Sequence, residues 1–258
     1  MNTDGLNTLM KQKITVIGGA GFVGTNLCRE LNLKKKFFEI IDIKISKEFP
    51  NRSKFGDVRD ITSLRNAITG NVVVNLAAAH RDDIQDHSIY YRTNVVGAEN
   101  IAKVCSEKGI KKILFTSSVA VYGFSNPGAD ENGQINPFND YGKTKLAAEN
   151  KFRDWQLRGN NSLIIIRPTV IFGEGNRGNV FNLMNQIASR KFIMIGHGNN
   201  KKSMAYIGNV VLFLLACIEI KKKYAVYNYV DKPDLTMNDL VSQVRKKLFG
   251  ILQIYILI

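Results

Sequence analysis

Short apolar runs alternate with amphipathic stretches along the first two thirds of the chain. The apolar runs are Ile14–Ile17, Phe37–Ile43, Val72–Ala78, Ile113–Thr116 and Ser162–Ile166. The helical patterns between them are Phe22–Leu31, Ile61–Ala67, Ser88–Lys108 and Asp140–Leu157. Continuous apolar strands that alternate with helices are typical of a parallel sheet covered on both faces. The pattern therefore predicts a doubly wound α/β domain over residues 11–170.

The remainder of the chain, residues 171–258, has a different pattern. It holds loops rich in glycine and asparagine, two helical stretches and one strand, Tyr224–Val230. This pattern predicts a small second lobe that closes over the crevice of the first domain. The last eight residues, Ile251–Ile258, include seven apolar ones, which is unusual because chain termini are commonly polar.

Composition limits the class of protein. The 258 residues are enough for one or two domains, and 45% of them are apolar. The three cysteines, Cys28, Cys105 and Cys217, are far apart, which excludes a disulfide framework and a zinc ribbon; no metal site is expected. The longest apolar run, Val210–Ile220, is shorter than the roughly 20 residues of a membrane-spanning helix, and no secretory signal is visible. A cytoplasmic location is therefore expected.

The chain is strongly basic, with 36 Lys and Arg residues against 22 Asp and Glu residues, a net charge of +14. Such a balance favours a polyanionic partner. No nucleic-acid-binding motif accompanies the lysine clusters, so a nucleic acid is not expected. Two interpretations remain open: a solvated basic surface, or peripheral contact with an anionic membrane surface at the inner face of the cytoplasmic membrane.

A glycine-rich turn follows the first predicted strand. Gly18, Gly21 and Gly24 form G-x-x-G-x-x-G, which permits a tight turn, a close backbone approach to a pyrophosphate and close packing of the next helix. The second strand ends at Asp42, at the spacing expected for a carboxylate that binds the adenosine ribose. A glycine-rich hairpin is the alternative for the turn alone. Together the features predict a Rossmann-type domain that binds NAD, and Asp42 disfavours NADP, although Lys44 nearby counts weakly the other way.

A second motif, Tyr141-Gly-Lys-Thr-Lys145, is Y-x-x-x-K on a predicted helix. Residues four apart share a helix face, so the Lys145 ammonium, together with the positive nicotinamide ring, is expected to lower the pKa of the Tyr141 phenol. Such a tyrosine can exchange a proton with a substrate alcohol during hydride transfer. Ser117 and Ser118 follow the fourth strand, where ligands bind in open α/β sheets. A solvated helix face and hydroxyls that only cap the strand are the alternatives.

These motifs, in this order, resemble the extended short-chain dehydrogenase/reductase family, in particular its NAD-dependent sugar epimerases and dehydratases. The matching stretches are Gly18–Gly24, Gly56–Val58, Asn75–Ala78, Ser117–Gly123, Tyr141–Lys145 and Arg167–Pro168. The resemblance implies a catalytic triad of Ser118, Tyr141 and Lys145. With the turn, it implies a cofactor site of Gly18, Gly21, Phe22, Val23, Gly24, Asp42, Asp57, Val58, Leu76, Ala77, Ala78, Asn94, Tyr141, Lys145 and Pro168.

Longer stretches are similar to one subgroup, the bacterial O-antigen 4-epimerases that act on N-acetylglucosamine diphospho-undecaprenol. They include His80–Asp83, Asn176–Val180, Lys202–Tyr206 and Tyr227–Asp234. The resemblance implies interconversion of N-acetylglucosamine and N-acetylgalactosamine through a 4-keto intermediate. Dehydration is disfavoured, because Val119 and Ala120 stand where dehydratases carry an Asp-Glu pair and neither transfers protons.

Substrate recognition follows from the same resemblance. The residues implied to contact the sugar diphosphate are Ser117, Ser118, Arg177, Asn179, Asn182 and Lys202. Lys202 stands near a position where nucleotide-sugar epimerases usually hold arginine, which binds phosphate with two donors where lysine acts as a point charge. The difference is consistent with the loss of a nucleotide site, but it does not prove a lipid-linked substrate. A surface loop with solvated charges is the alternative for the last four residues.

Three further expectations concern the whole chain. A UDP-sugar 4-epimerase is the alternative enzyme. Family members continue well beyond residue 258, so the resemblance implies a C-terminally truncated form in which residues 171–258 are an incomplete substrate-binding lobe. A catalytically impaired NAD-binding protein is the alternative from another class. The resemblance also implies a homodimer formed through the helices Ser88–Lys108 and Asp140–Leu157.

Overall fold

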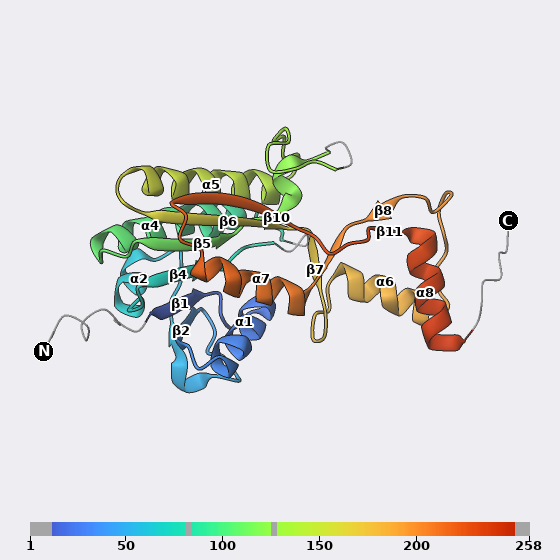
Figure 1. The fold of residues 1–258 in the computed structure, drawn as a ribbon, viewed down its shortest axis with the longest axis horizontal. Helices are drawn as coiled ribbons and strands as arrows, with labels where there is room; N and C mark the ends of the chain where they lie inside the picture. Colours follow the sequence, from blue (N-terminus) through green and yellow to red (C-terminus); the bar gives the residue numbers. More distant parts are fainter. Residues whose placement is uncertain (1–11, 81–83, 125–127, 251–258) are drawn as a thin grey trace, which may run out of the picture. The chain divides into compact units, whose positions relative to one another are not determined.

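The computed structural model describes residues 12–80, 84–124 and 128–250 (Figure 1). The chain divides into two compact units. Unit 1 comprises Met1–Pro168 and Val211–Tyr229, and unit 2 comprises Thr169–Val210 and Val230–Ile258. The apolar segment Ile251–Ile258 lies outside the described residues.

Unit 1 is built on a seven-stranded parallel sheet with the order β10-β6-β5-β4-β1-β2-β3. The strands are β1 (Lys13–Ile17), β2 (Phe37–Asp42), β3 (Ser53–Phe55), β4 (Val72–Asn75), β5 (Lys112–Thr116), β6 (Ser162–Pro168) and β10 (Tyr224–Tyr229). The doubly wound α/β class is confirmed. The strand order reverses between β1 and β4, so their carboxyl ends form the crevice where such sheets bind ligands.

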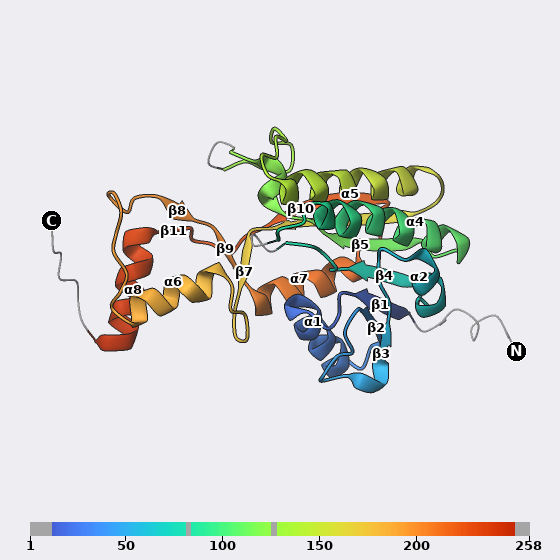
Figure 2. The ribbon, with the colours of Figure 1, turned by 180° about the vertical axis from the view of Figure 1, so that it is seen from behind.

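Helices cover both faces of this sheet (Figures 1 and 2). They are α1 (Phe22–Leu33), α2 (Ile61–Ala67), α4 (Gly97–Glu107), α5 (Asp140–Leu157) and α7 (Ile207–Glu219). The helices α1 and α7 lie on one face, and α2, α4 and α5 lie on the other. Phe115 of β5 and Phe152 of α5 pack with ring centroids 4.8 Å apart. Strands buried on both faces need apolar residues at successive positions, which is why they appear as continuous runs.

The predicted helix Ser88–Lys108 is interrupted in the structure. It comprises α3 (Ser88–Tyr90), the π-helical turn η3 (Tyr91–Val96) and α4. Gly97 begins α4 where a Cβ atom would lie 2.9 Å from Cγ2 of Val58. Single π-helical turns are rare and are frequent at functional sites, and this one contains Asn94.

Two strands of the sheet differ from the sequence pattern. The three-residue β3 has no predicted counterpart, because so short a segment has no readable periodicity. The predicted strand Tyr224–Val230 is present as β10, but it pairs in parallel with β6 at the edge of the large sheet, and Tyr122 of unit 1 donates a hydrogen bond to its Asn228. Unit 1 therefore takes in a strand from the last third of the chain.

Unit 2 holds two small sheets and two helices of its own. The strands β7 (Val170–Phe172) and β9 (Met204–Tyr206) pair in parallel, and β8 (Lys201–Lys202) pairs with β11 (Leu235–Thr236) in antiparallel fashion. The helices are α6 (Asn179–Ala188) and α8 (Met237–Phe249). With α7, the chain beyond residue 170 has three helices in its described part, one more than the sequence pattern predicts. No helix in this or any other described segment is both long and apolar enough to span a bilayer.

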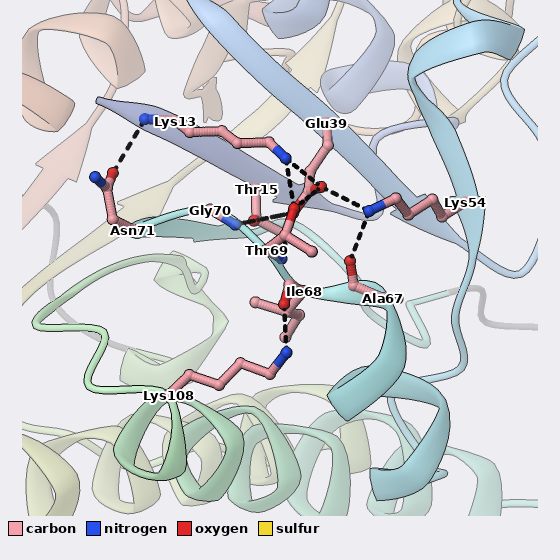
Figure 3. A network of polar contacts seen from close by, with 10 residues as sticks. All are labelled: Lys13, Thr15, Glu39, Lys54, Ala67, Ile68, Thr69, Gly70, Asn71 and Lys108. Atoms are coloured by element: carbon pink, nitrogen blue, oxygen red, sulfur yellow. Dashed lines mark hydrogen bonds and ion pairs between the residues drawn. The ribbon is translucent and has the colours of Figure 1, made fainter. Parts of the chain in front are cut away.

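A buried carboxylate ties the amino ends of the strands in unit 1 together (Figure 3). Glu39 of β2 accepts hydrogen bonds from the Thr15 hydroxyl at 2.7 Å and from the Thr69 amide at 2.6 Å. The Lys13 and Lys54 ammonium groups lie 3.0 and 3.1 Å from its Oε2 atom. The cluster joins β1, β2, β3 and the segment before β4 at the sheet edge opposite the crevice.

Candidate functional site

The glycine turn lies between β1 and α1, at the crevice. Gly18 has a φ of +81°, and a Cβ atom there would lie 2.7 Å from the Ala77 amide nitrogen. A Cβ atom on Gly24 would lie 2.3 Å from the Gly18 carbonyl oxygen. Both positions therefore require glycine, for a left-handed conformation and for the approach of α1 to the turn. At Gly21, the N-cap of α1, a Cβ atom would lie 3.3 Å from the Gly18 carbonyl oxygen, and no side chain caps the helix.

Asp42 closes the turn from the end of β2. Its Oδ2 atom accepts a hydrogen bond from the Ala20 amide at 3.0 Å, and its Oδ1 atom accepts one from the Lys44 amide at 3.1 Å. The carboxylate thus lies beside the helix N-terminus that begins with Phe22 and Val23. Backbone donors at a helix N-terminus with no side-chain cap, a cradle too tight for Cβ atoms and an adjacent carboxylate fit the diphosphate and ribose of a dinucleotide.

Asp57 and Val58 follow β3. The Arg59 guanidinium donates to both carboxylate oxygens of Asp57, at 2.9 and 3.0 Å from Nε, and this hydrogen bonding lowers the pKa of the Asp57 carboxyl. Val58 is buried against Gly97, and its carbonyl oxygen accepts a hydrogen bond from Asn100 at 2.9 Å. The structure therefore places these two residues in a fixed segment at the carboxyl end of the sheet.

Asn94 connects the loop after β4 with the helix α5. Its side chain accepts from the Ala79 amide at 2.8 Å and donates to the Ala79 carbonyl at 3.0 Å and to the Thr144 hydroxyl at 3.0 Å. The loop begins at Leu76, whose amide donates a hydrogen bond to the Ile17 carbonyl at 2.9 Å. Asn94 thus fixes the backbone that includes Ala77 and Ala78 against the helix that carries Tyr141 and Lys145.

Ser118 and Tyr141 meet across the ends of β5 and α5. The Ser118 hydroxyl oxygen caps the short helix η4 (Val119–Tyr122) by accepting from the Ala120 amide at 3.1 Å. Burial raises the pKa of the Tyr141 phenol, and a hydrogen bond with the Ser118 side chain opposes that rise. The two hydroxyls that the sequence predicts to act together are therefore in contact.

Lys145 lies one helical turn further along α5 and is almost fully buried. Its ammonium donates to the Thr116 carbonyl oxygen at 2.6 Å and lies 4.3 Å from the centre of the Phe115 ring. Burial lowers the pKa of Lys145 to about 7, and the charge of Glu149 acts in the opposite direction. In the chain by itself the pKa of the Tyr141 phenol is raised, because burial outweighs the Ser118 hydrogen bond. The lowering expected from Lys145 together with the nicotinamide ring stays a prediction, and the Lys145 ammonium here is directed at Thr116 and Phe115.

Two hydroxyls at the end of β5 are buried without a partner. Oγ1 of Thr116 and Oγ of Ser117 have no hydrogen-bond partner among the described residues. Buried polar atoms in native proteins are nearly always satisfied by protein, water or ligand. These hydroxyls adjoin Ser118, which is consistent with the substrate-binding role that the sequence predicts for Ser117.

A buried polar chain that begins one turn beyond Lys145 on α5 has no counterpart in the sequence predictions. Arg167 of β6 donates to both oxygens of Glu149 at 2.9 and 2.6 Å, and to the Tyr122 hydroxyl at 2.7 Å. Tyr122 in turn donates to Asn228 of β10 at 2.8 Å. Glu149 lies four residues after Lys145 on α5, a spacing that could have drawn attention to it. Pro168, which ends β6, directly follows Arg167.

The predicted substrate residues beyond residue 170 lie in unit 2. Arg177 precedes the N-cap of α6, and Asn179 and Asn182 lie on the exposed side of its first turn. Lys202 is half-buried in β8. Arg177, Asn179 and Asn182 therefore lie at the N-terminus of one helix, α6. Lys202 lies in a separate element of the same unit.

Known proteins are similar to this chain in sequence and in fold. Residues 14–229 match the family described as NAD dependent epimerase/dehydratase family. The chain is 48% identical over 247 residues to the N-acetyl-alpha-D-glucosaminyl-diphospho-ditrans,octacis-undecaprenol 4-epimerase of Escherichia coli O157:H7, covering 93% of this chain and 73% of that protein. It is 28% identical to the UDP-glucose 4-epimerase of Vibrio cholerae, covering 91% of this chain and 75% of that protein.

A solved structure of MoeE5 in complex with UDP-glucuronic acid and NAD superposes with a TM-score of 0.80 at 25% identity, covering 93% of this chain and 83% of that one. The family match spans most of the chain and includes the glycine turn, Asp42, Ser118, Tyr141 and Lys145. The chain therefore belongs to the NAD-dependent epimerase/dehydratase family, and its cofactor is NAD.

Proposed function

We propose that the protein is a sugar 4-epimerase that acts on a sugar diphosphate. The observation that carries the proposal is the contact of Ser118 with Tyr141 in the crevice of unit 1. The neighbouring Val119 and Ala120 supply no group for a second proton transfer, which supports epimerisation over dehydration. Bound NAD supplies the acceptor and then the donor of one hydride.

The residues of the chain have separate roles in the proposed reaction. Tyr141 takes the proton of the C4 hydroxyl as hydride leaves C4, and Ser118 holds the same oxygen. Lys145 lies on the same face of α5 as Tyr141, and we assign it, together with the positive nicotinamide ring of bound NAD, to favour the ionised form of the phenol. The resulting 4-keto sugar rotates within the site. Tyr141 then returns the proton to the oxygen on C4 while the hydride returns to C4 on the opposite face of the sugar. The cycle is redox-neutral, so no external oxidant is consumed.

We assign the substrate as N-acetylhexosamine carried on diphospho-undecaprenol, with N-acetylglucosamine and N-acetylgalactosamine as the two epimers. The 48% identity to a relative named for that substrate supports the assignment. Arg177, Asn179, Asn182 and Lys202 would bind the diphosphate, which is common to lipid-linked and UDP-linked sugars.

A UDP-sugar is the second candidate substrate, because another relative is a UDP-glucose 4-epimerase and MoeE5 was solved with UDP-glucuronic acid. Separate incubations with N-acetylglucosamine diphospho-undecaprenol and with UDP-N-acetylglucosamine distinguish the two. Conversion of the lipid-linked sugar to its epimer, read by mass spectrometry after release and sugar analysis, is the expected result. Conversion of the UDP-sugar alone would overturn the assignment of the carrier.

We further propose that the protein works as a homodimer at the inner face of the cytoplasmic membrane, where a lipid-linked sugar would be met. The family resemblance supports a dimer through α4 and α5, which line a surface hollow of about 370 Å³ where Ala102 and Trp155 lie among six polar or charged residues. Light scattering of Ala102→Glu against the unchanged chain tests it, and a dimer that persists in the variant would contradict this interface.

A further inference from the structure

The connection between α6 and β8 presents two isoleucines to solvent. Ile193 is 80% exposed and Ile195 is 92% exposed, among the most exposed apolar side chains in the described part of the chain. Phe192 and Met194, which alternate with them, are half-buried. The alternation places one pair of apolar side chains against unit 2 and directs the other pair outward.

Hydrogen bonds fix this connection at both ends. The Lys191 and Phe192 amides donate to the Gln186 carbonyl at the end of α6, at 2.9 and 3.0 Å. At the other end, Asn238 at the start of α8 donates its amide to the Gly198 carbonyl at 3.1 Å and its side chain to the His197 carbonyl at 2.8 Å. The connection is therefore anchored at both ends, and Ile193 and Ile195 lie between the two anchors.

The path of the connection adds to the argument. Arg190 lies with its guanidinium 4.8 Å from the ring of Phe249 at the end of α8, whereas Gly198 contacts the start of that helix. The connection thus runs alongside α8, as Figures 1 and 2 both show. Gly198 has a φ of +64°, and a Cβ atom there would lie 2.4 Å from the Asn238 side chain, so the anchoring depends on glycine.

Positive charge surrounds the isoleucines. Arg190 and Lys191 lie at the start of the connection, Lys201 directly follows it, and all three are exposed. Unit 2 as a whole has nine Lys and Arg residues and four Asp and Glu residues. The acids have partners within the unit: Glu174 accepts from Tyr206 at 3.0 Å, and Asp239 closes the capping box of α8.

We propose that residues 190–201 form a membrane-contact segment that inserts Ile193 and Ile195 into the headgroup region of an anionic phospholipid bilayer. Apolar side chains flanked by lysine and arginine are the combination that binds such surfaces, through apolar burial together with attraction to anionic lipid. A polyanion without an apolar layer would use the charges but leave the isoleucines in water. The inference rests on the proposed function in one respect, since a lipid-linked substrate gives the enzyme a reason to reach the membrane.

Vesicle binding tests the segment without requiring turnover. The full chain is sedimented with vesicles of phosphatidylcholine alone and with vesicles that contain 30% phosphatidylglycerol, at about 50 and 300 mM salt. We expect binding to the anionic vesicles, weaker at the higher salt. The variant Ile193→Ser/Ile195→Ser should bind at least roughly tenfold more weakly, because each isoleucine loses apolar burial.

The matched control removes apolar surface elsewhere. Leu33 and Ile45 of unit 1 are 72% and 53% exposed, so Leu33→Ser/Ile45→Ser changes surface hydrophobicity by a similar amount and should bind vesicles as the unchanged chain does. Arg190→Gln/Lys191→Gln should weaken binding and reduce its salt dependence. Equal binding by the isoleucine variant and the unchanged chain, or equal loss in the control, would overturn the proposal.

A substrate comparison separates this inference from the proposed function. The isoleucine variant should turn over a water-soluble analogue with a short prenyl chain at the unchanged rate, and it should lose rate only with substrate embedded in vesicles. An equal loss with the soluble analogue would show that the segment acts on the substrate itself and would overturn membrane contact. Absence of any turnover by the unchanged chain counts against the proposed function, and vesicle binding then decides for or against the membrane-contact segment by itself.

Discussion

Tyr141 is the residue on which the proposed chemistry depends most directly. Tyr141→Phe removes one oxygen and leaves the ring that packs at the start of α5. Without the proton-transfer group, we expect kcat to fall by about 10²–10⁴-fold, while NAD affinity measured by fluorescence titration stays within about twofold. Tyr91→Phe is the control, because Tyr91 is exposed on η3. A Tyr141→Phe enzyme with full kcat would exclude this residue as the proton carrier.

Glu39 gives a residue-scale prediction about stability. Burial alone would raise the pKa of its carboxyl, but hydrogen bonds from Thr69, Thr15 and Lys13 lower it to about 2. A carboxyl with a lowered pKa stabilises the fold at pH values above its pKa in the unfolded chain, here about 4.5. This contribution disappears as the pH falls from 4.5 to 2. The difference corresponds to about 3 kcal/mol.

Glu39→Gln should therefore lower the free energy of unfolding at pH 7 by up to about that amount, with the gap to the unchanged chain closing between pH 4.5 and 2. Urea unfolding at several pH values measures both quantities. Glu99→Gln is the matched control, since the Glu99 side chain is 59% exposed. A gap that stays constant across this pH range would show that the charge of Glu39 is not what the cluster requires.

At the scale of elements, α5 carries three groups of the site at successive turns: Tyr141, Lys145 and Glu149. Glu149 is held by Arg167, which lies in β6. The charge of Glu149 raises the pKa of Lys145 against the larger effect of burial, so its removal should lower that pKa further. If the ammonium form supports the phenolate, activity falls as the pH rises through the pKa of Lys145.

Glu149→Gln should accordingly move the fall of kcat/KM to lower pH, whereas Glu149→Asp, which keeps the charge, should leave it close to its original position. Pairing the two variants separates the electrostatic effect from the cost of leaving Arg167 without a carboxylate, which reaches about 3–5 kcal/mol for a buried pair. The pH profile of kcat/KM is the measurement. A shift of the same size in both variants would mean that Glu149 acts by packing alone.

Elements with a strong local pattern could be predicted from the sequence, and contacts between distant elements could not. The helix Asp140–Leu157 is confirmed with both its bounds, because Asn139 caps it and Tyr141 begins its motif. The glycine turn and Asp42 follow from spacing within one strand–helix–strand unit. The apolar pattern of Ser88–Lys108 is that of one continuous helix, so it does not reveal the π-helical turn η3 inside it.

The same reasoning explains which parts of the site the sequence did not reveal. The salt bridge between Arg167 and Glu149 joins residues on different elements, and its burial is set by the packing of α5 on the sheet. The raised pKa of Tyr141 in the chain by itself comes from burial, which cannot be read from a motif. The spacing of Tyr141 and Lys145 predicts the correct helix face, but the ammonium direction depends on Thr116 of β5.

At the scale of the whole molecule, the proposed NAD contacts fall on unit 1: the glycine turn, Asp42 and the proposed catalytic residues all belong to it. A ligand that binds only the folded state raises stability by about 2.7 kcal/mol at 100 times its Kd. For a protein of this size each kcal/mol corresponds to roughly 2–4 °C in Tm. Differential scanning calorimetry with and without NAD therefore reports which part of the chain the cofactor stabilises.

If the two units unfold together, the single transition should move up by roughly 5–11 °C at that NAD concentration. If they unfold separately, the larger transition of unit 1 should move and the smaller one should stay. Gly24→Ala should show neither shift, because a Cβ atom there would lie 2.3 Å from the Gly18 carbonyl oxygen and displace α1 from the turn. A smaller transition that moves by itself would place the NAD contacts in unit 2, against the assignment of the crevice.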